Sequence, residues 1–378
     1  MSRTKTFPIP NPFIESLEPY KPVTSREIAL KDSERKVLKL DWNESTRPPS
    51  PEVTKSILAQ LSRNHMNLYP DITARELRDK LSKYTGQSPD HILVTNGSDD
   101  ALKLIINTYV KPGGKVIVPV PTYSHFLVFA QAQGGDILEI EYDDPFVVQW
   151  EKLFETTSLN PELYYLPSPS NPTGILYLFP QVARLAELAP QSIILVDEAY
   201  FEFSQKSVVE LVNSWPNIVV TRTFSKAFGM AGLRIGYVIG HPHVIEDLSR
   251  LHNPKSVNTI SQAAAIGALK DIEYTMRYVE SVNEAKEFLL KELDKLGVEA
   301  KGTPANYVMI KVPRASEVVQ ALAKRKCFVR DRSSLPGLKD WFRVTVGPKE
   351  DMEEFLARFK DVLRELNSQI TDSAKNPL

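Results

Sequence analysis

One lysine of this chain lies where covalent chemistry is possible. Lys226 falls in TRTFSKAFGMAGLR (221–234), a stretch of small and hydroxylated residues that contains neither Asp nor Glu. A lysine amine in a partly desolvated pocket loses its proton readily and can then form an imine with an aldehyde. Arg234 lies eight residues later, and a guanidinium binds phosphate through paired hydrogen bonds. The stretch indicates an imine-forming lysine beside an anion site, although Lys226 taken alone is more simply a solvated loop lysine.

A second candidate is a carboxylate at the end of an apolar run. Asp197 follows SIILV (192–196), where an unpaired charge is costly. A protonated pyridine nitrogen is a suitable partner, and this pair recurs in sites for pyridoxal 5'-phosphate (PLP); the alternative is an Asp that caps the next helix. The groups that can bind a dianion are hydroxyls and the N–H groups that open a helix, here Thr223, Ser225, Gly97, Ser98 and Asp99.

The candidate residues follow short apolar segments. We expect strands within 91–97, 115–120, 163–167, 192–197, 217–223 and 233–240, separated by helical stretches such as 98–110. Continuous apolar strands that alternate with helices predict an α/β fold with a largely parallel sheet covered on both faces. Ligands of such sheets bind beyond the carboxyl ends of the strands. The segments at those ends are Asn96 to Asp99, Pro121 to Tyr123, Ser168 to Gly174, Asp197 to Tyr200 and Thr223 to Lys226.

The chain divides into three parts by composition. Residues 1–50 are punctuated by Pro and read as an N-terminal arm that joins the small domain, and 51–289 form the large domain. Residues 290–370 form a smaller α+β domain, with strands within 306–312, 327–333 and 341–347 and helices over 316–325 and 350–366. The length of 378 residues is sufficient for two domains.

Composition excludes several classes of protein. Lys and Arg number 46 against 47 Asp and Glu, so no global field favours nucleic acid or a membrane surface. A single cysteine, Cys327, excludes an intrachain disulfide and is typical of a reducing compartment. No signal-peptide pattern or membrane-spanning apolar run is visible. We expect a soluble cytoplasmic protein with a small-molecule substrate and no nucleic-acid or membrane partner.

Several motifs, taken in order, resemble one superfamily. NGSDDAL (96–102), SPSNPTG (168–174), DEAYFEF (197–203) and SKAFGMAGLR (225–234) are similar to signatures of the fold-type I PLP-dependent enzymes, the aspartate-aminotransferase superfamily. LEPYKP (17–22), LYPD (68–71), PTY (121–123), VRDRSSLPGL (329–338) and FRVTVGPKEDM (342–352) most resemble histidinol-phosphate aminotransferases. The resemblance covers about residues 12–365. It implies a mostly parallel seven-stranded sheet between helices, with a smaller α+β domain, and a PLP-dependent aminotransferase.

The resemblance also implies roles for individual residues. Lys226 would hold PLP as a Schiff base and move protons, and Asp197 would keep the ring nitrogen protonated. Asn171 and Tyr200 would contact the ring 3-oxygen, and Tyr123 would stack on the ring unless it is a core tyrosine. The cofactor phosphate would lie against residues at two strand ends, namely Gly97, Ser98, Asp99, Thr223, Ser225 and Arg234.

Further roles concern the substrate and a second subunit. Tyr69 would reach the phosphate of the neighbouring subunit, which implies a homodimer. Arg343 would clamp the substrate α-carboxylate. Tyr20 and Arg330 match substrate contacts of the histidinol-phosphate branch, although an exposed Tyr and a solvated Arg are the simpler interpretations. The remaining substrate candidates are Asn43 and Asn171.

One segment departs from the family pattern. The branch has Asn-Glu-Asn-Pro followed by Gly near its N-terminus, whereas this chain has LDWNESTRPPSP (40–51), which keeps only Asn43 and Glu44. The segment is expected to border the substrate pocket, so the donor, the acceptor and the reaction type stay open. The alternative to transamination is a PLP-dependent lyase or cyclase, for example of hydroxyarginine, or a decarboxylase of a phosphorylated amino acid.

Other functional classes are disfavoured. The glycines at 229, 232 and 236 lack the spacing of a dinucleotide-binding loop, and KPGGK (111–115) is a turn and not a P-loop. His241 and His243 read as a turn in preference to a metal site, and we expect no metal. The amphipathic helix over 350–366 is better explained by core packing than by a partner. An inactive binding protein of this fold is disfavoured because all the residues for PLP chemistry are retained.

Overall fold

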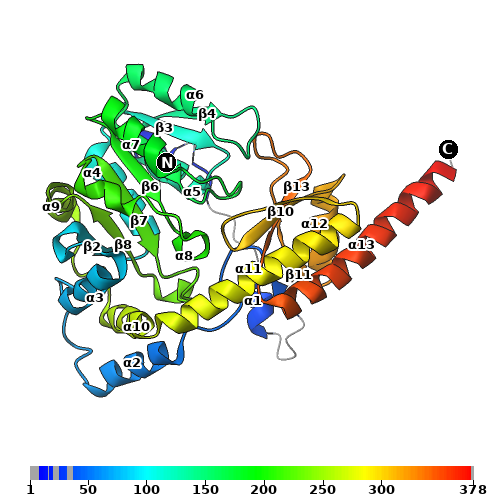
Figure 1. Ribbon diagram of the computed structural model, residues 1–378, viewed down its shortest axis with the longest axis horizontal. Helices are drawn as coiled ribbons and strands as arrows, with labels where there is room; N and C mark the ends of the chain where they lie inside the picture. Colours follow the sequence, from blue (N-terminus) through cyan, green and yellow to red (C-terminus); the bar gives the residue numbers. More distant parts are fainter. Residues whose placement is uncertain (1–7, 16, 20–24, 32–36, 376–378) are drawn as a thin grey trace, which may run out of the picture.

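The computed structural model describes residues 8–15, 17–19, 25–31 and 37–375. It consists of a large sheet sandwiched between helices and a smaller sheet backed by long helices, with the C-terminal helix projecting from the body (Figure 1). This arrangement confirms the predicted α/β class.

The large sheet has seven strands. Their order is β2 (Ile92–Thr95), β8 (Gly236–Gly240), β7 (Ile218–Thr223), β6 (Ile193–Asp197), β5 (Leu163–Pro167), β3 (Lys115–Val120) and β4 (Asp136–Glu141). Only β8 runs antiparallel to its neighbours. The edge strand β4 was not among the segments predicted as strands, because its sequence DILEIE alternates apolar and acidic residues as a half-exposed edge strand does.

Both faces of the large sheet are covered because successive side chains of a strand point to opposite faces. Val116 and Val118 of β3 pack into one apolar cluster, whereas Ile117 packs into another. The first cluster includes α4 (Ser98–Tyr109), α5 (Ser124–Ala132) and α9 (Pro242–Leu251). The second includes α2 (Pro51–Ser62), α3 (Arg75–Thr85), α6 (Trp150–Glu155), α7 (Phe179–Leu188) and α10 (Thr259–Lys270).

The small sheet is antiparallel and carries its own core. Its order is β12 (Arg330–Asp331), β13 (Trp341–Thr345), β10 (Tyr307–Lys311) and β9 (Glu299–Gly302). Phe342, Val344 and Val308 pack against α11 (Ile272–Lys295), α12 (Ala315–Lys324) and α13 (Lys349–Lys375). The boundary predicted at 289/290 falls within α11 and stays a prediction. The last helix extends beyond the predicted range of 350–366.

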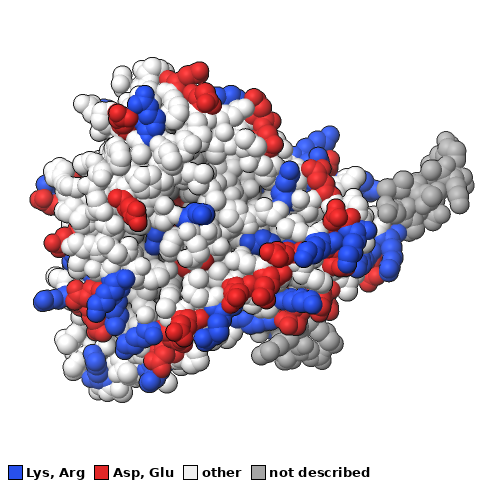
Figure 2. Space-filling model, in the orientation of Figure 1, with Lys and Arg blue, Asp and Glu red and all other residues white. Residues whose placement is uncertain are grey.

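The N-terminal segment reaches the small sheet side of the molecule. After α1 (Ser25–Lys31), β1 (Leu38–Lys39) pairs in parallel with β11 (Cys327–Phe328). The chain then continues into α2, which packs on the large sheet. The short helix α8 (Phe201–Ser204) follows β6. Charged side chains of both signs line the side of α11 and α13 in the face drawn in Figure 2, so that face has no field of a single sign.

Candidate functional site

The strand ends of the large sheet bring most of the predicted site residues together. Gly97, Ser98 and Asp99 connect β2 to α4, Tyr123 follows β3, and Asn171 follows β5. The end of β6 supplies Asp197 and Tyr200, and the end of β7 supplies Thr223, Ser225 and Lys226. Because β2, β3, β5, β6 and β7 share one direction, these ends lie at one edge of the sheet.

Asp197 is a buried carboxylate with neutral partners. Its exposed fraction is 6%. Thr221 Oγ1 donates a hydrogen bond of 2.9 Å to Oδ1, and the Tyr165 hydroxyl donates one of 3.0 Å to Oδ2. Burial raises the pKa of Asp197 to about 6, while the two hydroxyls act in the opposite direction. A cationic ring nitrogen would provide the counter-charge that this carboxylate lacks within the described residues.

Lys226 lies beside Trp42 and Tyr200, and its amine donates to a neutral acceptor. Nζ donates a 3.1 Å hydrogen bond to the carbonyl oxygen of Trp42. It also lies 5.7 Å from the centre of the Tyr200 ring. The Tyr200 hydroxyl accepts a 2.9 Å hydrogen bond from Asn43 Nδ2, which places the N-terminal segment in the site. A single bond to a carbonyl leaves the amine available for covalent attachment of a cofactor.

A helix N-terminus, two hydroxyls and an arginine form one end of the site, where a phosphate could bind. Arg234 Nη1 donates to Ser225 Oγ at 3.2 Å, and Nη2 lies 3.1 Å from Asp99 Oδ2. Thr223 Oγ1 donates to Ser225 Oγ at 2.9 Å. The first N–H groups of α4, from Ser98 on, have no acceptor within the helix. These donors fit a phosphate dianion.

Two glycines allow the close approach that this end requires. Gly97 has a φ of +84°, which favours glycine. A Cβ at Gly97 would lie 2.6 Å from Arg234 Nη2. At Gly236 a Cβ would lie 2.8 Å from Ser98 N, so only glycine lets β8 pass behind the turn.

Tyr123 is tied to the same end. Its hydroxyl donates a 2.9 Å hydrogen bond to Asp99 Oδ1. Burial, and then the charge of Asp99, raise the pKa of Tyr123. The ring is therefore held in place near Asp197 and Tyr200, which also influence its pKa, as a ring that stacks on a flat cofactor would be.

The opposite end of the site is built on the small sheet. Arg343 of β13 is buried, and its Nη1 donates to Asn171 Oδ1 at 2.5 Å, while Nη2 donates to the Asp41 carbonyl oxygen at 2.6 Å. Its buried Nε has no partner in the described part of the chain. Arg330 is the register partner of Arg343 across β12 and β13, so the two side chains share a face.

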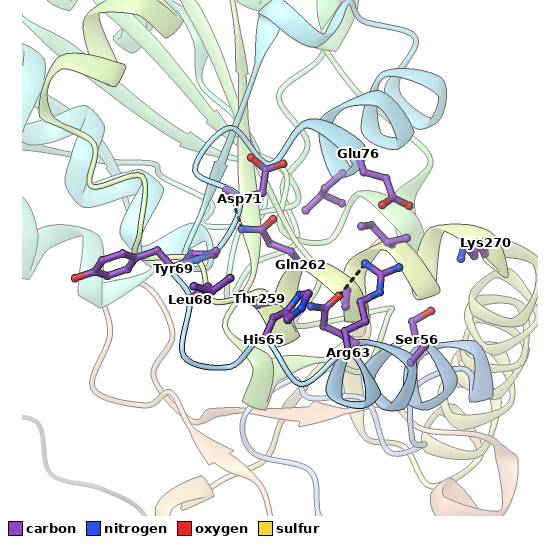
Figure 3. Close-up of a pocket in the computed structure, with 16 residues that line it drawn as sticks. Ser56, Arg63, His65, Leu68, Tyr69, Asp71, Glu76, Thr259, Gln262 and Lys270 are labelled. Atoms are coloured by element: carbon purple, nitrogen blue, oxygen red, sulfur yellow. Dashed lines mark hydrogen bonds between the residues drawn. The ribbon is translucent and has the colours of Figure 1, made fainter.

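Two predicted residues are not placed in this site. Tyr20 lies outside the described residues. Tyr69 is 80% exposed, and its ring extends away from a separate pocket of about 340 Å³ between α2, α3 and α10 (Figure 3). Gln262 and Asp71 both line that pocket, and Gln262 Nε2 donates a 3.0 Å hydrogen bond to the Asp71 carbonyl oxygen. Lys226 and Asp197 do not line it.

The residues fit PLP at each of its functional groups. Arg234, Ser225 and the start of α4 can hold the phosphate, and Asp197 can hold the ring nitrogen. Lys226 can hold the aldehyde carbon. Two observations support this fit: Asp197 is buried with no cationic partner among the described residues, and the turn at Gly97 lies so close to β8 that only glycine is accommodated at position 236.

Comparison with known proteins agrees with this reading. The family model for aminotransferase class I and II matches residues 35–359. The chain belongs to this family. It is a PLP-dependent aminotransferase of fold type I, similar above all to histidinol-phosphate aminotransferases.

Three relatives define the similarity of this aminotransferase. A dihydroxyacetone phosphate transaminase of Campylobacter jejuni is 36% identical over 90% of this chain and 94% of its own length. A histidinol-phosphate aminotransferase of Symbiobacterium thermophilum is 34% identical over 93% of this chain and 98% of its own. The crystal structure of histidinol-phosphate aminotransferase from Sinorhizobium meliloti in complex with PLP superposes with a TM-score of 0.85 at 25% identity. The match covers 96% of this chain and 99% of that one.

The residues of the segment that departs from the family pattern, 40–51, lie in two different surroundings. Asn43 enters the aminotransferase site, where its Oδ1 accepts a 3.1 Å hydrogen bond from Thr345 Oγ1. Arg47, four residues later, points to α13 and lies 3.1 Å from Asp351 Oδ2. The substitutions after Glu44 therefore contact the small domain through Arg47.

Sequence patterns missed several residues of this site. Thr221 is the register partner of Asp197 on the next strand, and Tyr165 is on the strand at its other side. Tyr307 packs edge-on against Tyr200 at 5.5 Å, and its hydroxyl donates to the Ser170 carbonyl oxygen. Arg332 was also missed, although it follows Arg330 by two residues in VRDRS, the spacing that places two side chains on the same face of a strand. Thr221, Tyr165 and Tyr307 have no sequence signal, because strand pairing brings in the first two and packing of the small sheet against the large domain brings in Tyr307.

The remaining candidates have structural roles. His241 caps α9, its Nδ1 accepting a 3.3 Å hydrogen bond from the His243 backbone N–H. The described residues contain no cluster of three or more His, Cys, Asp or Glu side chains suited to a metal ion. Within the same residues, no helix combines the length and apolar character needed to cross a bilayer.

Proposed function

We propose that this aminotransferase acts on an amino acid or an amino-alcohol phosphate, with Lys226 as the covalent attachment point of PLP. The observation that carries the proposal is Arg343, a buried guanidinium that Asn171 holds beside the strand ends of the large sheet and whose Nε has no partner among the residues that the structure describes. Such a group binds a substrate anion. The names of two similar aminotransferases, which refer to dihydroxyacetone phosphate and histidinol phosphate, support a phosphorylated substrate.

Each residue then has a chemical task. When bound, PLP supplies an electron-withdrawing ring that stabilises negative charge at the substrate α-carbon. Lys226 Nζ gives up its hydrogen bond to Trp42 and carries the proton to and from that carbon as general acid and base. Asp197 would keep a proton on the ring nitrogen, and Thr221 and Tyr165 hold the carboxylate in position for this purpose. Tyr200, whose hydroxyl is oriented by Asn43, would donate a hydrogen bond to the ring 3-oxygen.

The experiment has two steps. Borohydride reduction of the holoenzyme followed by mass spectrometry of peptides is expected to find the cofactor on Lys226. Incubation with histidinol phosphate, dihydroxyacetone phosphate with an amino donor, aromatic amino acids, arginine and hydroxyarginine then identifies the substrate. Pyridoxamine phosphate formed with histidinol phosphate, or pyridoxamine phosphate returned to PLP by dihydroxyacetone phosphate, supports the proposal. Release of carbon dioxide or ammonia without pyridoxamine phosphate contradicts it and favours a decarboxylase, lyase or cyclase.

We also propose that the active protein is a homodimer in which Tyr69 reaches the cofactor phosphate of the second subunit. Exposed apolar side chains gather on α2 and the segment after it, namely Leu58, Leu61, Met66, Leu68, Tyr69 and Ile72. A gathering of exposed apolar residues is typical of an interface. The protein is proposed to work in the cytoplasm, since its one cysteine, Cys327, is a buried thiol.

Mixed subunits test the role of Tyr69. Tyr69→Ala and Lys226→Ala subunits are each expected to have little activity alone. If Tyr69 acts on the second subunit, a mixed dimer has one site with both defects and one intact site, so mixing restores activity. A mixture that forms dimers by light scattering without recovery would assign Tyr69 to its own subunit and contradict the proposal.

A further inference from the structure

Three charged side chains of the large domain are buried together beside the short helix α8. They are Glu198, Arg222 and Glu202, and each is no more than 2% exposed. Arg222 points to the face of β7 opposite to Thr221, because successive side chains of a strand alternate. Thr221 is the residue that holds Asp197. The cluster of two carboxylates and one guanidinium therefore lies behind the strand that helps to build the site, and no step described so far uses it.

Arg222 pairs with one of the two carboxylates and not with the other. Its Nε donates a 2.9 Å hydrogen bond to Glu198 Oε2, and its Nη2 lies 2.8 Å from the same oxygen. Nη2 also donates to Ser207 Oγ at 2.8 Å. Glu202 instead accepts a 3.1 Å hydrogen bond from the Tyr84 hydroxyl and makes no ion pair within the described part of the chain. The cluster thus has one cation for two acidic groups.

The proton on Glu202 determines the net charge of this cluster. With Glu198 ionised and Arg222 charged, a protonated Glu202 leaves the cluster neutral. An ionised Glu202 leaves one negative charge in a space closed to water, which is costly. Burial raises the pKa of Glu202 to about 7, while the charge of Arg222 acts in the opposite direction. Glu202 therefore exchanges its proton near neutral pH.

The titratable groups that face Glu202 come from four elements. They are Tyr84 of α3, Glu198 after β6, Arg222 of β7 and Tyr237 of β8. Burial raises the pKa of Tyr237, and the charge of Glu202 adds to this rise. On the side of α11, helix α8 is met by a ring contact of 6.4 Å between Tyr278 and Phe203. Arg222 is the one cation in this set, and it is already paired.

Glu202 is joined to a residue of the site through a very short element. It lies two residues after Tyr200, in the four-residue helix α8, and Tyr200 caps this helix without a side-chain hydrogen bond. One turn of helix is not stable by itself, so side-chain contacts must hold α8 in place. The Arg222 guanidinium lies 3.6 Å from the centre of the Phe201 ring, and the Tyr84 ring packs edge-on against Phe201 at 6.5 Å.

The same contacts extend to the loop that carries the lysine. Phe228 lies two residues after Lys226, and its ring packs edge-on against Tyr84 at 6.1 Å. Tyr84, the hydrogen-bond partner of Glu202, therefore contacts both the segment that follows Tyr200 and the segment that follows Lys226.

We propose that Glu202 is a positioning residue of this aminotransferase: in its protonated form it holds α8, and with it Tyr200, in place, and it releases α8 when it ionises. Glu202 is assigned no contact with the cofactor or the substrate and acts through Tyr200 and the ring contacts of Tyr84. An ionised Glu202 regains its solvation when water reaches it, and the single turn of α8 is the element that can move to admit water. The inference goes beyond the proposed substrate and does not depend on it.

The first experiment detects the proton on Glu202 in the holoenzyme. Infrared difference spectra are recorded between about pH 5.5 and about pH 8.5, a range that spans the ionisation, for the parent and for Glu202→Gln. The parent is expected to show the carbonyl band of a buried carboxylic acid, which disappears with a midpoint near pH 7. The band should be missing from Glu202→Gln. Other carboxyl groups, Asp197 among them, are common to both proteins and cancel in the comparison.

The second experiment measures whether that proton matters for the reaction. Above the midpoint, kcat of the parent should fall by up to about tenfold per pH unit, because only the protonated form keeps Tyr200 in place. KM should change less, since the substrate anion is assigned to Arg343. Glu202→Gln has no proton to lose at this position, so the decline in kcat with this midpoint should be absent.

Two further variants make the result specific. Tyr84→Phe removes the hydroxyl that favours the ionised carboxylate, so the midpoints of the band and of kcat should both move to higher pH. Glu187→Gln removes an exposed carboxylate of the same domain that pairs with Arg184 and should leave both midpoints unchanged. Circular dichroism is expected to match in all variants, so the shifts do not reflect misfolding.

The outcomes separate this inference from the proposed function. Loss of both the band and the decline in kcat in Glu202→Gln supports it. A parent without the band overturns it, and so does a Tyr84→Phe midpoint that moves to lower pH. The same decline in kcat in the parent and in Glu202→Gln also overturns it, because another group then controls the rate. Any amino donor that the enzyme accepts serves for kcat, so failure of the proposed substrate class leaves this inference standing.

Discussion

The two ends of the site differ in whether their arginines are paired with carboxylates. At the cofactor end, Arg234 lies 3.1 Å from Asp99, and both side chains are about 40% exposed. At the proposed substrate end, Arg343 is 3% exposed and hydrogen-bonds to an amide and a carbonyl oxygen, and the buried Nε of Arg332 has no partner among the described residues. At the proposed cofactor end the arginine therefore has a carboxylate partner, whereas at the proposed substrate end the described residues pair neither arginine with a carboxylate.

This difference has a physical reason. A resident cofactor is bound continuously, so its site can be stabilised by many neutral N–H and hydroxyl donors with one arginine that is partly screened by solvent. A substrate that enters and leaves must be selected in each cycle, and buried charges left unpaired in its absence give that selection. The comparison predicts that changes at one end leave binding at the other end intact.

The largest effect is expected at Lys226, which lies between the ends. Lys226→Ala should lower kcat by about 10²–10⁴-fold, the usual contribution of a positioned general acid and base. PLP should still bind at the phosphate end without the covalent link, so dialysis should remove it faster. Steady-state kinetics and the absorbance of bound cofactor measure both. Unchanged kcat would show that another residue carries the proton.

A somewhat smaller effect concerns pH and Asp197. Folding raises the pKa of this carboxyl from 3.8 to about 6, so the folded apoprotein holds the proton more tightly than the unfolded chain does. Its contribution to stability is therefore largest at low pH and is lost as pH rises from about 4 to about 6, a change of about 3 kcal/mol. Urea unfolding of apoprotein should show this decline in the parent and not in Asp197→Asn.

The cofactor supplies the control for that measurement. With PLP bound, a protonated ring nitrogen pairs with Asp197, so the decline in stability between pH 4 and 6 should shrink in the holoenzyme. Burial raises the pKa of Glu202 to about 7. Because Glu202 is present in the parent apoprotein, in Asp197→Asn and in the holoenzyme, its contribution cancels when their unfolding free energies are subtracted. Identical pH profiles for apoprotein and holoenzyme would contradict the pairing.

Arg343 distinguishes the two ends most directly. Arg343→Ala should weaken binding of amino substrates by about tenfold to a hundredfold, because a charge-assisted hydrogen bond is worth about 1.5–3 kcal/mol. Affinity for PLP should change by less than about twofold, since Arg343 is not assigned to the cofactor phosphate. Titrations with PLP and with substrate test this directly, and equal losses for both would break the comparison.

The smallest effect is expected at Arg234. Arg234→Gln should weaken PLP binding by about fivefold, because the arginine is partly exposed and its contribution is screened. The KM for substrate at saturating PLP should stay the same. Fluorescence titration of the apoprotein with PLP gives the first value. A change confined to KM would place Arg234 at the substrate end instead.

Much of the fold and of the cofactor end follows from the sequence because the relevant patterns are local. The apolar runs that become β3, β5, β6, β7 and β8 are read directly, and the polar residues after them lie at the predicted edge. The edge strand β4 was missed, because alternating apolar and acidic residues lack the continuous apolar run that marks a buried strand. Gly97 and Gly236 show their purpose only when β8 is placed behind the turn.

The substrate end depends on contacts between segments far apart in the chain. Asn43 and Tyr200 are hydrogen-bonded although they are 157 positions apart in the sequence. Arg343 and Asn171 are hydrogen-bonded across 172 positions. Arg332 looks like an ordinary surface arginine in the sequence. Its significance comes from the pairing of β12 with β13, which turns it to the same face as Arg343 and away from the core.

The sequence by itself determined the cofactor and the enzyme superfamily, since the order of the motifs around Asn171, Asp197 and Lys226 reflects chemistry that a short stretch of chain can carry, but it left the reaction type open. Only the tertiary structure decided which charges stay without partners, because the pairing of a buried charge depends on strands and loops brought together from distant positions. Arg234 lies beside the Asp99 carboxylate, whereas the buried Nε of Arg332 has no partner within the described part of the chain, and the surroundings in the fold make this difference between two identical side chains.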